Sequence, residues 1–562
     1  MTARPVFANL PDRAFDLIVI GAGINGAGIA RDAAARGLRV LLVDKGDIGG
    51  GTTSWSTRLI HGGLRYLEHG EIGLVRESLR ERERLLRIVP HLVRPLPLLI
   101  PIYTGDQRGP WLIRAGMLAY DLLSYDKSLA RHEMLSRAES LARLPGLNPD
   151  GLRGAALYYD AQVEFPERLA VENALAASAA GATLLTYARV ERIVVEAGRA
   201  RGVELVDLLQ AGAGPVVVRA PVIINVAGPW VDEVLAGVPG REPAPLLGGT
   251  KGSHLVVGGF AGAPDQALYA AAREDGRPFF IIPWNDQYLI GTTDVWFHGD
   301  LDCLVASEAE IDYLLAETNR VIPGAGLSRA AIHYTYAGVR PLPFVPAGRA
   351  GAITRRHLLH DHGRDGVTGL FSVVGGKLTT YRELAVHAVD RAQRALGLPL
   401  TPSTTERTPL PGTPGADGDF ALFRRRFVAE SGVPERSAGH LADTYGVRAN
   451  DVLALATTDD LRRSFDDASG AIGAEVLFAF AHEAAQTLTD VLMRRTMVGL
   501  GPELGIGADQ VAADIAARHL GWERGRCIQE VDAYRAYVER FRLRHHVASW
   551  YKRPTAADSD QQ

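Results

Sequence analysis

Cysteine is almost missing from this chain, since its 562 residues contain only Cys303 and Cys527. With no CxxC pair and no Cys/His cluster, the sequence offers neither a disulfide framework nor a zinc site. We therefore expect no metal centre and a reducing, cytoplasmic setting. A surplus of charge is missing too, because 61 Lys and Arg residues stand against 65 Asp and Glu residues, a formal net charge of −4. Without an overall positive field, no nucleic-acid partner is expected.

Long hydrophobic runs are also missing. A membrane-spanning helix needs about 18 or more consecutive apolar residues, and the longest candidates, residues 96–103 and 17–30, are too short or broken by glycine. Residues 1–13 lack the basic flank, apolar core and cleavage site of a signal peptide. We expect neither a membrane span nor export. The composition, 47% hydrophobic and 22% charged, is typical of a globular protein with about three domains.

The strongest motif lies near the N-terminus. Residues 15–21 form an apolar run with strand character, residues 25–36 show a helical pattern, and residues 40–43 form a second run that ends at Asp44. The glycine motif between the first strand and the helix contains Gly21, Gly23, Asn25 and Gly26. Such a turn brings backbone and a helix N-terminus to a pyrophosphate, and Asp44 can accept hydrogen bonds from a ribose. The pattern predicts a dinucleotide site, the alternative being a glycine turn without a ligand.

A second polar segment follows at residues 52–66. Its hydroxyl residues could line a ribityl and pyrophosphate chain, and the basic and aromatic residues beyond them could face a substrate. The alternative is a polar loop with a helix cap. The hydroxyl residues are Thr52, Thr53, Ser54, Ser56 and Thr57, and the residues near the Gly62-Gly63 pair are His61, Arg65 and Tyr66.

The third segment runs from an apolar strand through two glycines into a helix. It contains Gly376, Lys377, Leu378 and Thr379, and its lysine is one of only five in the chain. A flavin gains negative charge near N1 and C2 on reduction, which a helix N-terminus and a lysine stabilise. We therefore favour FAD over NAD as the dinucleotide. The alternative is that Lys377 is a solvated residue of the helix cap.

Together these motifs resemble the FAD-dependent, quinone-linked glycerol-3-phosphate dehydrogenase family. The resemblance spans nearly the whole chain. It depends on GAGINGAGIARDAAARG, STRLIHGGLRYLEHG, KGSH, IPW, IGTTD, AGVRPL, AITR and VVGGKLTTYR. Where the family usually has N-A-T-G-P-W, this chain has Ala227 before Gly228, a methyl in place of a hydroxyl near the expected FAD site.

The resemblance implies an α/β plus α+β fold with three parts. The first is a discontinuous Rossmann-type FAD-binding domain over residues 14–399. An antiparallel-sheet substrate domain is inserted in it at about residues 92–150 and 250–345. A linker at residues 400–419, rich in proline, threonine and glycine, leads to an all-α C-terminal domain over residues 420–562. Helices are expected there at residues 420–430, 474–492, 507–519 and 528–547.

The resemblance also implies an activity. The enzyme would oxidise sn-glycerol 3-phosphate at C2 to dihydroxyacetone phosphate, with hydride passing to flavin N5 and electrons leaving to membrane quinone. Arg340 and Arg355 would bind the phosphate as planar, permanently charged donors. Arg65, Tyr66, Lys377 and Thr379 would share that pocket. His61 is the titratable candidate for the general base, with an arginine as the alternative.

Other readings of the same residues stay open. A soluble glycerol-3-phosphate oxidase would use O2 and release H2O2. A relative that oxidises amino acids or amines is disfavoured by the number of cations, and a flavin-binding protein without turnover is disfavoured by the complete residue set. A quinone-linked enzyme would associate peripherally with the cytoplasmic face of a membrane. The candidate contact segments are residues 424–426 and 540–553, which could also be ordinary solvated helix ends. A homodimer is possible.

Overall fold

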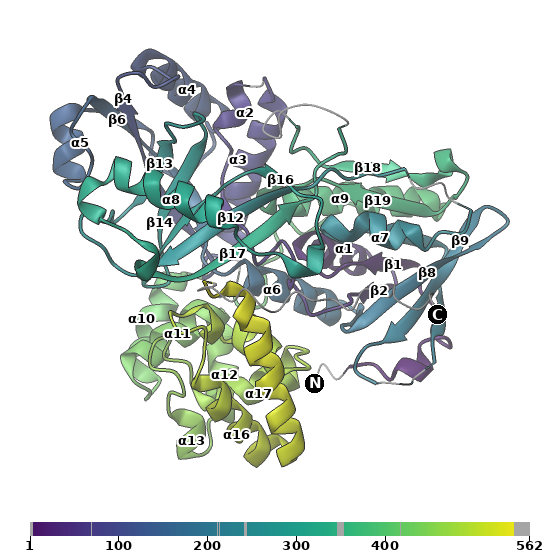
Figure 1. The fold of residues 1–562 in the computed structure, drawn as a ribbon. Coiled ribbons are helices and arrows are strands. Elements are labelled where there is room, and N and C mark those ends of the chain that lie inside the picture. The colour runs from purple at the N-terminus through teal and green to yellow at the C-terminus, as the bar shows by residue number, and fades with distance from the viewer. Residues whose placement is uncertain are drawn as a thin grey trace, which may run out of the picture.

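The computed structural model describes residues 4–68, 70–210, 212, 214–240, 244–345, 353–415 and 418–543. The candidate membrane segment 540–553 therefore lies mostly outside the described residues. Two large sheets and a set of C-terminal helices make up the fold (Figure 1). This arrangement confirms the predicted fold class. Among the described residues, none of the helices combines the length and apolarity that crossing a bilayer demands.

The first sheet has six strands in the order β18-β19-β11-β1-β2-β7, parallel except for the antiparallel edge strand β18. Alternate residues of a strand point to opposite faces. Leu17 and Val19 therefore pack against helices, whereas Ile18 and Ile20 pack toward a three-stranded sheet. The strands are β1 (Leu17–Ile20), β2 (Val40–Val43), β7 (Thr183–Leu185), β11 (Val222–Asn225), β18 (Leu358–Asp361) and β19 (Leu370–Val374).

Both faces of this sheet are covered, as a parallel sheet requires. One face carries α1 (Ile24–Ala35), α6 (Pro166–Ala179) and α9 (Tyr381–Ala395). The other face carries α7 (Val231–Ala236) and the sheet β10-β9-β8, formed by β8 (Ala188–Glu196), β9 (Arg199–Asp207) and β10 (Val216–Arg219). The carboxyl ends of β1, β2, β11 and β19 meet at one edge, which is where such sheets bind ligands.

The second sheet is larger and mostly antiparallel. Its main path is β16-β12-β15-β14-β13-β4-β6-β3, with β17 added to β12 and β5 added to β6. The strands are β3 (Leu59–Ile60), β4 (Val93–Tyr103), β5 (Glu133–Ser136), β6 (Leu152–Val163), β12 (Thr250–Val257), β13 (Ala267–Ala271), β14 (Pro278–Trp284), β15 (Gln287–Gly291), β16 (Val295–Trp296) and β17 (Ile332–Arg340).

Strand β4 shows why a proline-rich stretch can still lie inside a sheet. It contains Pro95, Pro97 and Pro101 and pairs with β6 along nearly its whole length. Its other neighbour, β13, pairs only at Leu98 and Leu99. Proline lacks a backbone donor and is tolerated where one side of the strand needs no ladder hydrogen bond.

The C-terminal region is helical. Its main helices are α10 (Phe420–Glu430), α11 (Glu435–Tyr445), α12 (Ala449–Leu455), α14 (Gly473–His482), α16 (Ala508–Leu520) and α17 (Arg524–Val538). One predicted helix, at residues 474–492, was wrong: α14 ends at His482, and a separate turn, α15 (Leu488–Asp490), begins at Leu488. Thr487 and Asp490 form the capping box of that turn, which leads into a π-helical turn at Val491–Arg495.

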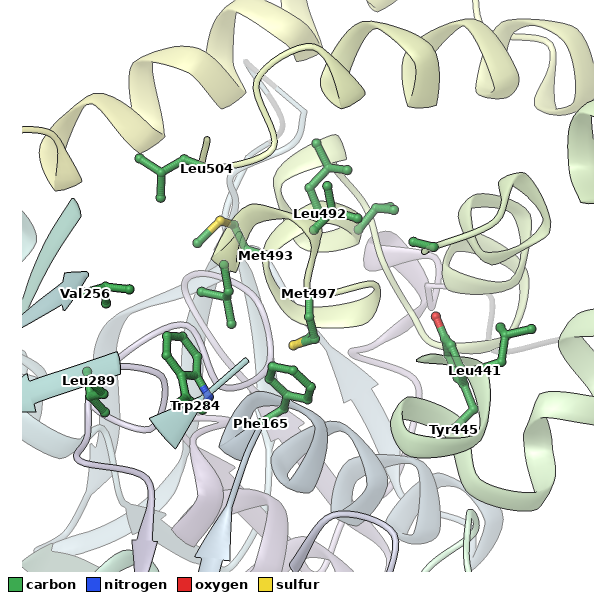
Figure 2. Packing of buried hydrophobic residues seen from close by; sticks show 14 of the residues in the cluster. Phe165, Val256, Trp284, Leu289, Leu441, Tyr445, Leu492, Met493, Met497 and Leu504 are labelled. Carbon is green, nitrogen blue, oxygen red and sulfur yellow. The ribbon is translucent and has the colours of Figure 1, made fainter. Parts of the chain in front are cut away.

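These helices share an apolar core with the second sheet. Figure 2 shows Trp284, Val256 and Leu289 of that sheet on one side and Met493 and Leu504 of the C-terminal region on the other. Buried salt links add to this packing, because Arg494 and Arg495 both contact Asp47, which follows β2. The C-terminal region is thus bound to both sheets.

Candidate active site

The dinucleotide motif forms the turn between β1 and α1. Gly21 has a φ of 110°, and a Cβ there would lie 2.7 Å from the carbonyl oxygen of Val226. A Cβ on Gly26 would lie 1.7 Å from the carbonyl oxygen of Gly21, so Gly26 permits the close packing of helix on turn. The Ile24 amide donates to Thr53 Oγ1 at 3.0 Å. These contacts leave the N-terminus of α1 facing the carboxyl edge of the sheet.

Asp44 lies at the end of β2, as the sequence predicts. Its carboxylate accepts hydrogen bonds from the amides of Ala22 at 2.6 Å and Gly46 at 2.8 Å. Burial raises the pKa of Asp44, while these two amides act in the opposite direction. A carboxylate held in this way can still accept hydrogen bonds from ribose hydroxyls.

A cavity of about 1030 Å³ runs along this edge. It is bounded by the dinucleotide turn, the loop after β2, the β11 end and the Gly375-Gly376 turn. The sequence-predicted residues that line it are Gly21, Gly23, Asn25, Asp44, Thr52, Thr53, Ser56, Gly228, Gly376, Lys377 and Leu378. Gly26, Ser54, Thr57 and Thr379 are not among the lining residues. Ser54 donates to the Gly49 carbonyl oxygen, and Thr57 bonds with His254.

Several features of the cavity wall suit a bound dinucleotide. The Asn25 side-chain oxygen is buried without a hydrogen-bond partner among the described residues. Gly376 has a φ of 100° and lies against the Asn25 side chain, whereas a Cβ on Gly228 would point into open space. A buried oxygen without a donor, beside backbone that approaches closely, indicates a ligand that supplies the missing hydrogen bond.

The C-terminal region forms one wall of the cavity. The sequence did not predict this contribution. Thr487, Arg494, Gln529, Tyr537 and Phe541 are among its lining residues. Nothing in the local pattern of these helices marks them as cofactor contacts, because they reach the cavity only through the packing of one domain on another.

A cluster of arginines gathers around one carboxylate at the other end of the site. Asp294 contacts Arg277 at 2.7 Å, Arg340 at 2.9 Å and Arg355 at 3.3 Å. The three guanidiniums hold the pKa of Asp294 well below its usual range, against the effect of burial. Burial and the neighbouring arginines lower the pKa of Arg340 to about 10. The pKa of Arg65 is likewise lowered, by burial first and then by Arg277 and Arg355.

Within the described residues, the guanidiniums of Arg277, Arg340 and Arg355 therefore converge on the carboxylate of Asp294, and Arg65 lies close to two of them. Such a surplus of positive charge favours a bound anion, and planar guanidiniums match phosphate in particular. Arg65, Arg340 and Arg355 were predicted, and the structure brings them together.

Arg277 and the role of Asp294 were missed, although a signal was present. Strands β14 and β15 pair antiparallel, from Trp284 with Gln287 to Phe280 with Gly291. Continuing this register by three residues places Arg277 opposite Asp294. Because a hairpin turn fixes the register of its two strands, the predicted turn at residues 285–286 already implied that Arg277 lies opposite Asp294.

Lys377 connects the arginine cluster to the cavity. Its ammonium lies 4.7 Å from the centre of the Tyr66 ring and donates to Ser78 Oγ at 2.9 Å and to the His61 carbonyl oxygen at 3.3 Å. Burial lowers the pKa of Lys377 to about 7. Burial raises the pKa of Tyr66, whereas the positive charges of Arg355, Arg340 and Arg65 act to lower it.

His61 lies against the same lysine. Burial, with Lys377 and Arg82, lowers the pKa of His61 to about 3, so its ring is neutral at ordinary pH. The His61 amide donates to Thr379 Oγ1 at 3.1 Å, which joins the loop after β3 to the turn before α9. The predicted substrate-side residues thus form one continuous group.

Comparison with known proteins agrees with this geometry. The model of the "FAD dependent oxidoreductase" family matches residues 16–382, and the model described as "C-terminal domain of alpha-glycerophosphate oxidase" matches residues 403–527. The fold and the cavity therefore define an FAD-dependent oxidoreductase, and FAD is its cofactor.

Individual relatives narrow the family. A glycerol-3-phosphate dehydrogenase of Synechocystis is 45% identical over 544 residues, covering 95% of this chain and 98% of that one. The D-erythritol 1-phosphate dehydrogenase of Brucella abortus is 38% identical, covering 86% and 94%. A Bacillus halodurans glycerol-3-phosphate dehydrogenase solved with FAD has a TM-score of 0.77 at 26% identity, covering 95% and 96%. The chain belongs to the FAD-dependent glycerol-3-phosphate dehydrogenase family.

Proposed function

We propose that this protein oxidises sn-glycerol 3-phosphate to dihydroxyacetone phosphate. The observation that carries the proposal is the cluster of Arg65, Arg277, Arg340 and Arg355 next to the cofactor cavity. FAD, when bound, supplies an acceptor for the hydride that leaves C2 of the substrate. The arginines bind the phosphate and thereby orient C2 toward the cavity.

We assign the general base to Lys377 rather than to His61. A base is most effective when its pKa lies near the working pH, and Lys377 has a pKa of about 7 whereas that of His61 is about 3. In its neutral form the Lys377 amine takes the proton of the C2 hydroxyl. His61 then acts as a neutral wall of the pocket, held in place by Thr379.

We further propose that membrane quinone is the electron acceptor and that the enzyme is peripherally associated with the cytoplasmic face of the membrane. The alternative, an oxidase that reduces O2 to H2O2, shares the same substrate site. A second candidate substrate is D-erythritol 1-phosphate, favoured by the relative that bears that name. Both substrates offer a phosphate and a neighbouring alcohol to the same arginines.

Anaerobic bleaching of the flavin tests these points together. Glycerol 3-phosphate is added to the FAD-loaded protein without oxygen, and the visible flavin band is followed. Rapid bleaching with glycerol 3-phosphate and slow bleaching with D-erythritol 1-phosphate and with unphosphorylated glycerol support the proposal. Reoxidation by a quinone analogue but only slowly by air supports the dehydrogenase. Absence of bleaching in fully loaded protein would exclude both activities.

A further inference from the structure

Helix α4 (Pro110–Leu123) exposes an apolar face to solvent. Trp111 is 81% exposed, Leu122 is 74% and Tyr125, just beyond the helix, is 77%. Leu118 lies between them on the same face, since residues three, four and seven apart share one side of a helix. Leu112, Ala115 and Ala119 extend this face, and all three are exposed.

The opposite side of α4 is apolar as well. Ile113, Met117 and Tyr120 are buried in the core of the second sheet. Apart from Arg114 and Asp121, α4 is thus apolar on both its buried and its outward side, whereas a helix at a protein surface normally has a polar outer face. Exposed apolar patches rimmed by polar residues mark sites of interaction.

Charge beside this face favours an anionic surface. Asp121 forms salt bridges with Lys127 and His132, and Asp126 forms one with Arg76, so both acidic residues are paired. Arg114 on the helix and Arg131 after it are exposed, and neither makes an ion pair with any residue in the described ranges. The exposed acidic residue of the same segment, Glu133, begins β5 beyond Arg131. Trp and Tyr at the ends of an apolar face with nearby arginines are the composition of an interfacial helix.

The position of α4 joins this face to the active site. The Tyr120 hydroxyl accepts a hydrogen bond from the Gly62 amide at 2.9 Å and donates to Asp160 at 2.7 Å. Gly62 follows His61 in the substrate-side loop. The outer face of α4 is therefore only about one helix diameter, roughly 10 Å, from that loop. In Figure 1, α4 lies at the end of the molecule away from α10, α11 and α16.

We propose that the outer face of α4, formed by Trp111, Leu118, Leu122 and Tyr125, docks on a lipid bilayer that contains anionic lipid. This inference rests on the proposed function, since an acceptor dissolved in the bilayer must reach a site beside the bilayer. It places the contact on α4 rather than on residues 424–426, of which Arg424 is bound to Asp443.

Flotation of the FAD-loaded full chain with vesicles tests the proposal. The vesicles are phosphatidylcholine with about one third phosphatidylglycerol. Leu118→Gln/Leu122→Gln should reduce the bound fraction at least about tenfold, because burial of each leucine contributes strongly to interfacial binding. Val511→Gln/Ile528→Gln is the matched control, since both residues are exposed apolar residues of the C-terminal helices. Its binding should equal that of the unchanged protein.

A second measurement locates the helix. Brominated lipid should quench part of the tryptophan fluorescence. Trp111→Phe should bind the vesicles normally but lack the quenched part of that fluorescence.

Equal flotation of the Leu118/Leu122 variant and the unchanged protein would overturn the proposal, as would absence of flotation of the unchanged protein. Size-exclusion chromatography that shows a dimer broken by the same substitutions, without lipid binding, would make this face a contact between two copies. Flavin bleaching with glycerol 3-phosphate and a soluble dye should be the same in all variants, so failure of the proposed function is recognised separately.

Discussion

Arg340 donates a hydrogen bond to Asp294 at 2.9 Å, and the same carboxylate contacts Arg277 and Arg355. One acidic residue thus keeps three guanidiniums close together that would otherwise repel one another. Arg340 also donates to Thr292 and Thr293, and Arg277 donates to the Asp294 carbonyl oxygen, so the proposed phosphate would be bound by the N–H groups that these contacts leave. We expect Asp294 to act on the substrate through these arginines, as a positioning residue.

Asp294→Asn should therefore weaken substrate binding. With the shared counter-charge removed, the guanidiniums separate, and we expect the KM for glycerol 3-phosphate to rise about 10- to 100-fold, the equivalent of one or two charge-assisted hydrogen bonds. The flavin spectrum should not change. Asp312→Asn, which removes an exposed partner of Arg329, is the control and should leave KM unaltered. An unchanged KM in the Asp294 variant would contradict the positioning role.

Much of this site was predictable because its motifs are local. The turn after β1, Asp44 and the Gly376-Lys377 turn each lie where a strand ends, and parallel strands end at one edge. Arg277 required the register of the β14–β15 hairpin, a non-local property. The wall formed by Tyr537 and Phe541 required knowledge of domain packing, which no periodicity encodes.

The pH dependence of flavin reduction should identify the base. If Lys377 is the base, it must act in its neutral form, and because its pKa is about 7 the rate of flavin reduction should fall as pH drops below about 7. Lys377→Met should lose most of the activity, and small primary amines should restore part of it. Raising the pH to about 10 should not restore the activity of Lys377→Arg, because arginine stays protonated over that range.

His61→Asn serves as the comparison for the lysine variants. If Lys377 is the base, His61→Asn loses a modest part of the rate of flavin reduction, and this rate still falls below about pH 7. If the fall disappears in His61→Asn but remains in Lys377→Met, the base is His61 instead.

Gly376→Ala should abolish stable FAD binding. Gly376 has a φ of 100°, and a Cβ there would lie 3.1 Å from Leu384 and 3.3 Å from Asn25. The methyl group strains the turn and displaces the Asn25 side chain from the cavity wall. We expect purified protein with little flavin, measured as the ratio of visible to ultraviolet absorbance. Gly397→Ala shares a positive φ, of 70°, but has no atom within 4 Å of its Cβ position. It should lose some thermal stability and keep its flavin, and equal flavin loss in both variants would point to backbone strain alone.

The attachment of the C-terminal region depends on a buried carboxylate. Glu483 contacts Arg168 of α6 at 2.5 Å and Arg448 at 2.7 Å, and these arginines lower its pKa to about 2 against the effect of burial. A carboxyl whose pKa is lower in the folded state stabilises the protein above its unfolded pKa, here about 4.5, and this contribution is lost as pH falls toward 2. Glu483→Gln leaves Arg168 and Arg448 with Glu172 as their remaining buried counter-charge, at 3.5 Å and 3.2 Å, so we expect it to cost about 3 kcal/mol at pH 7. The loss should shrink as pH falls from about 4.5 to 2, measured by denaturant unfolding across that range. The control is Glu191→Gln, which removes an exposed ion pair with Arg189 and should change the free energy of unfolding by less than about 1 kcal/mol at either pH. An equally small effect of Glu483→Gln would show that the Glu483 ion pairs do not hold the two regions together.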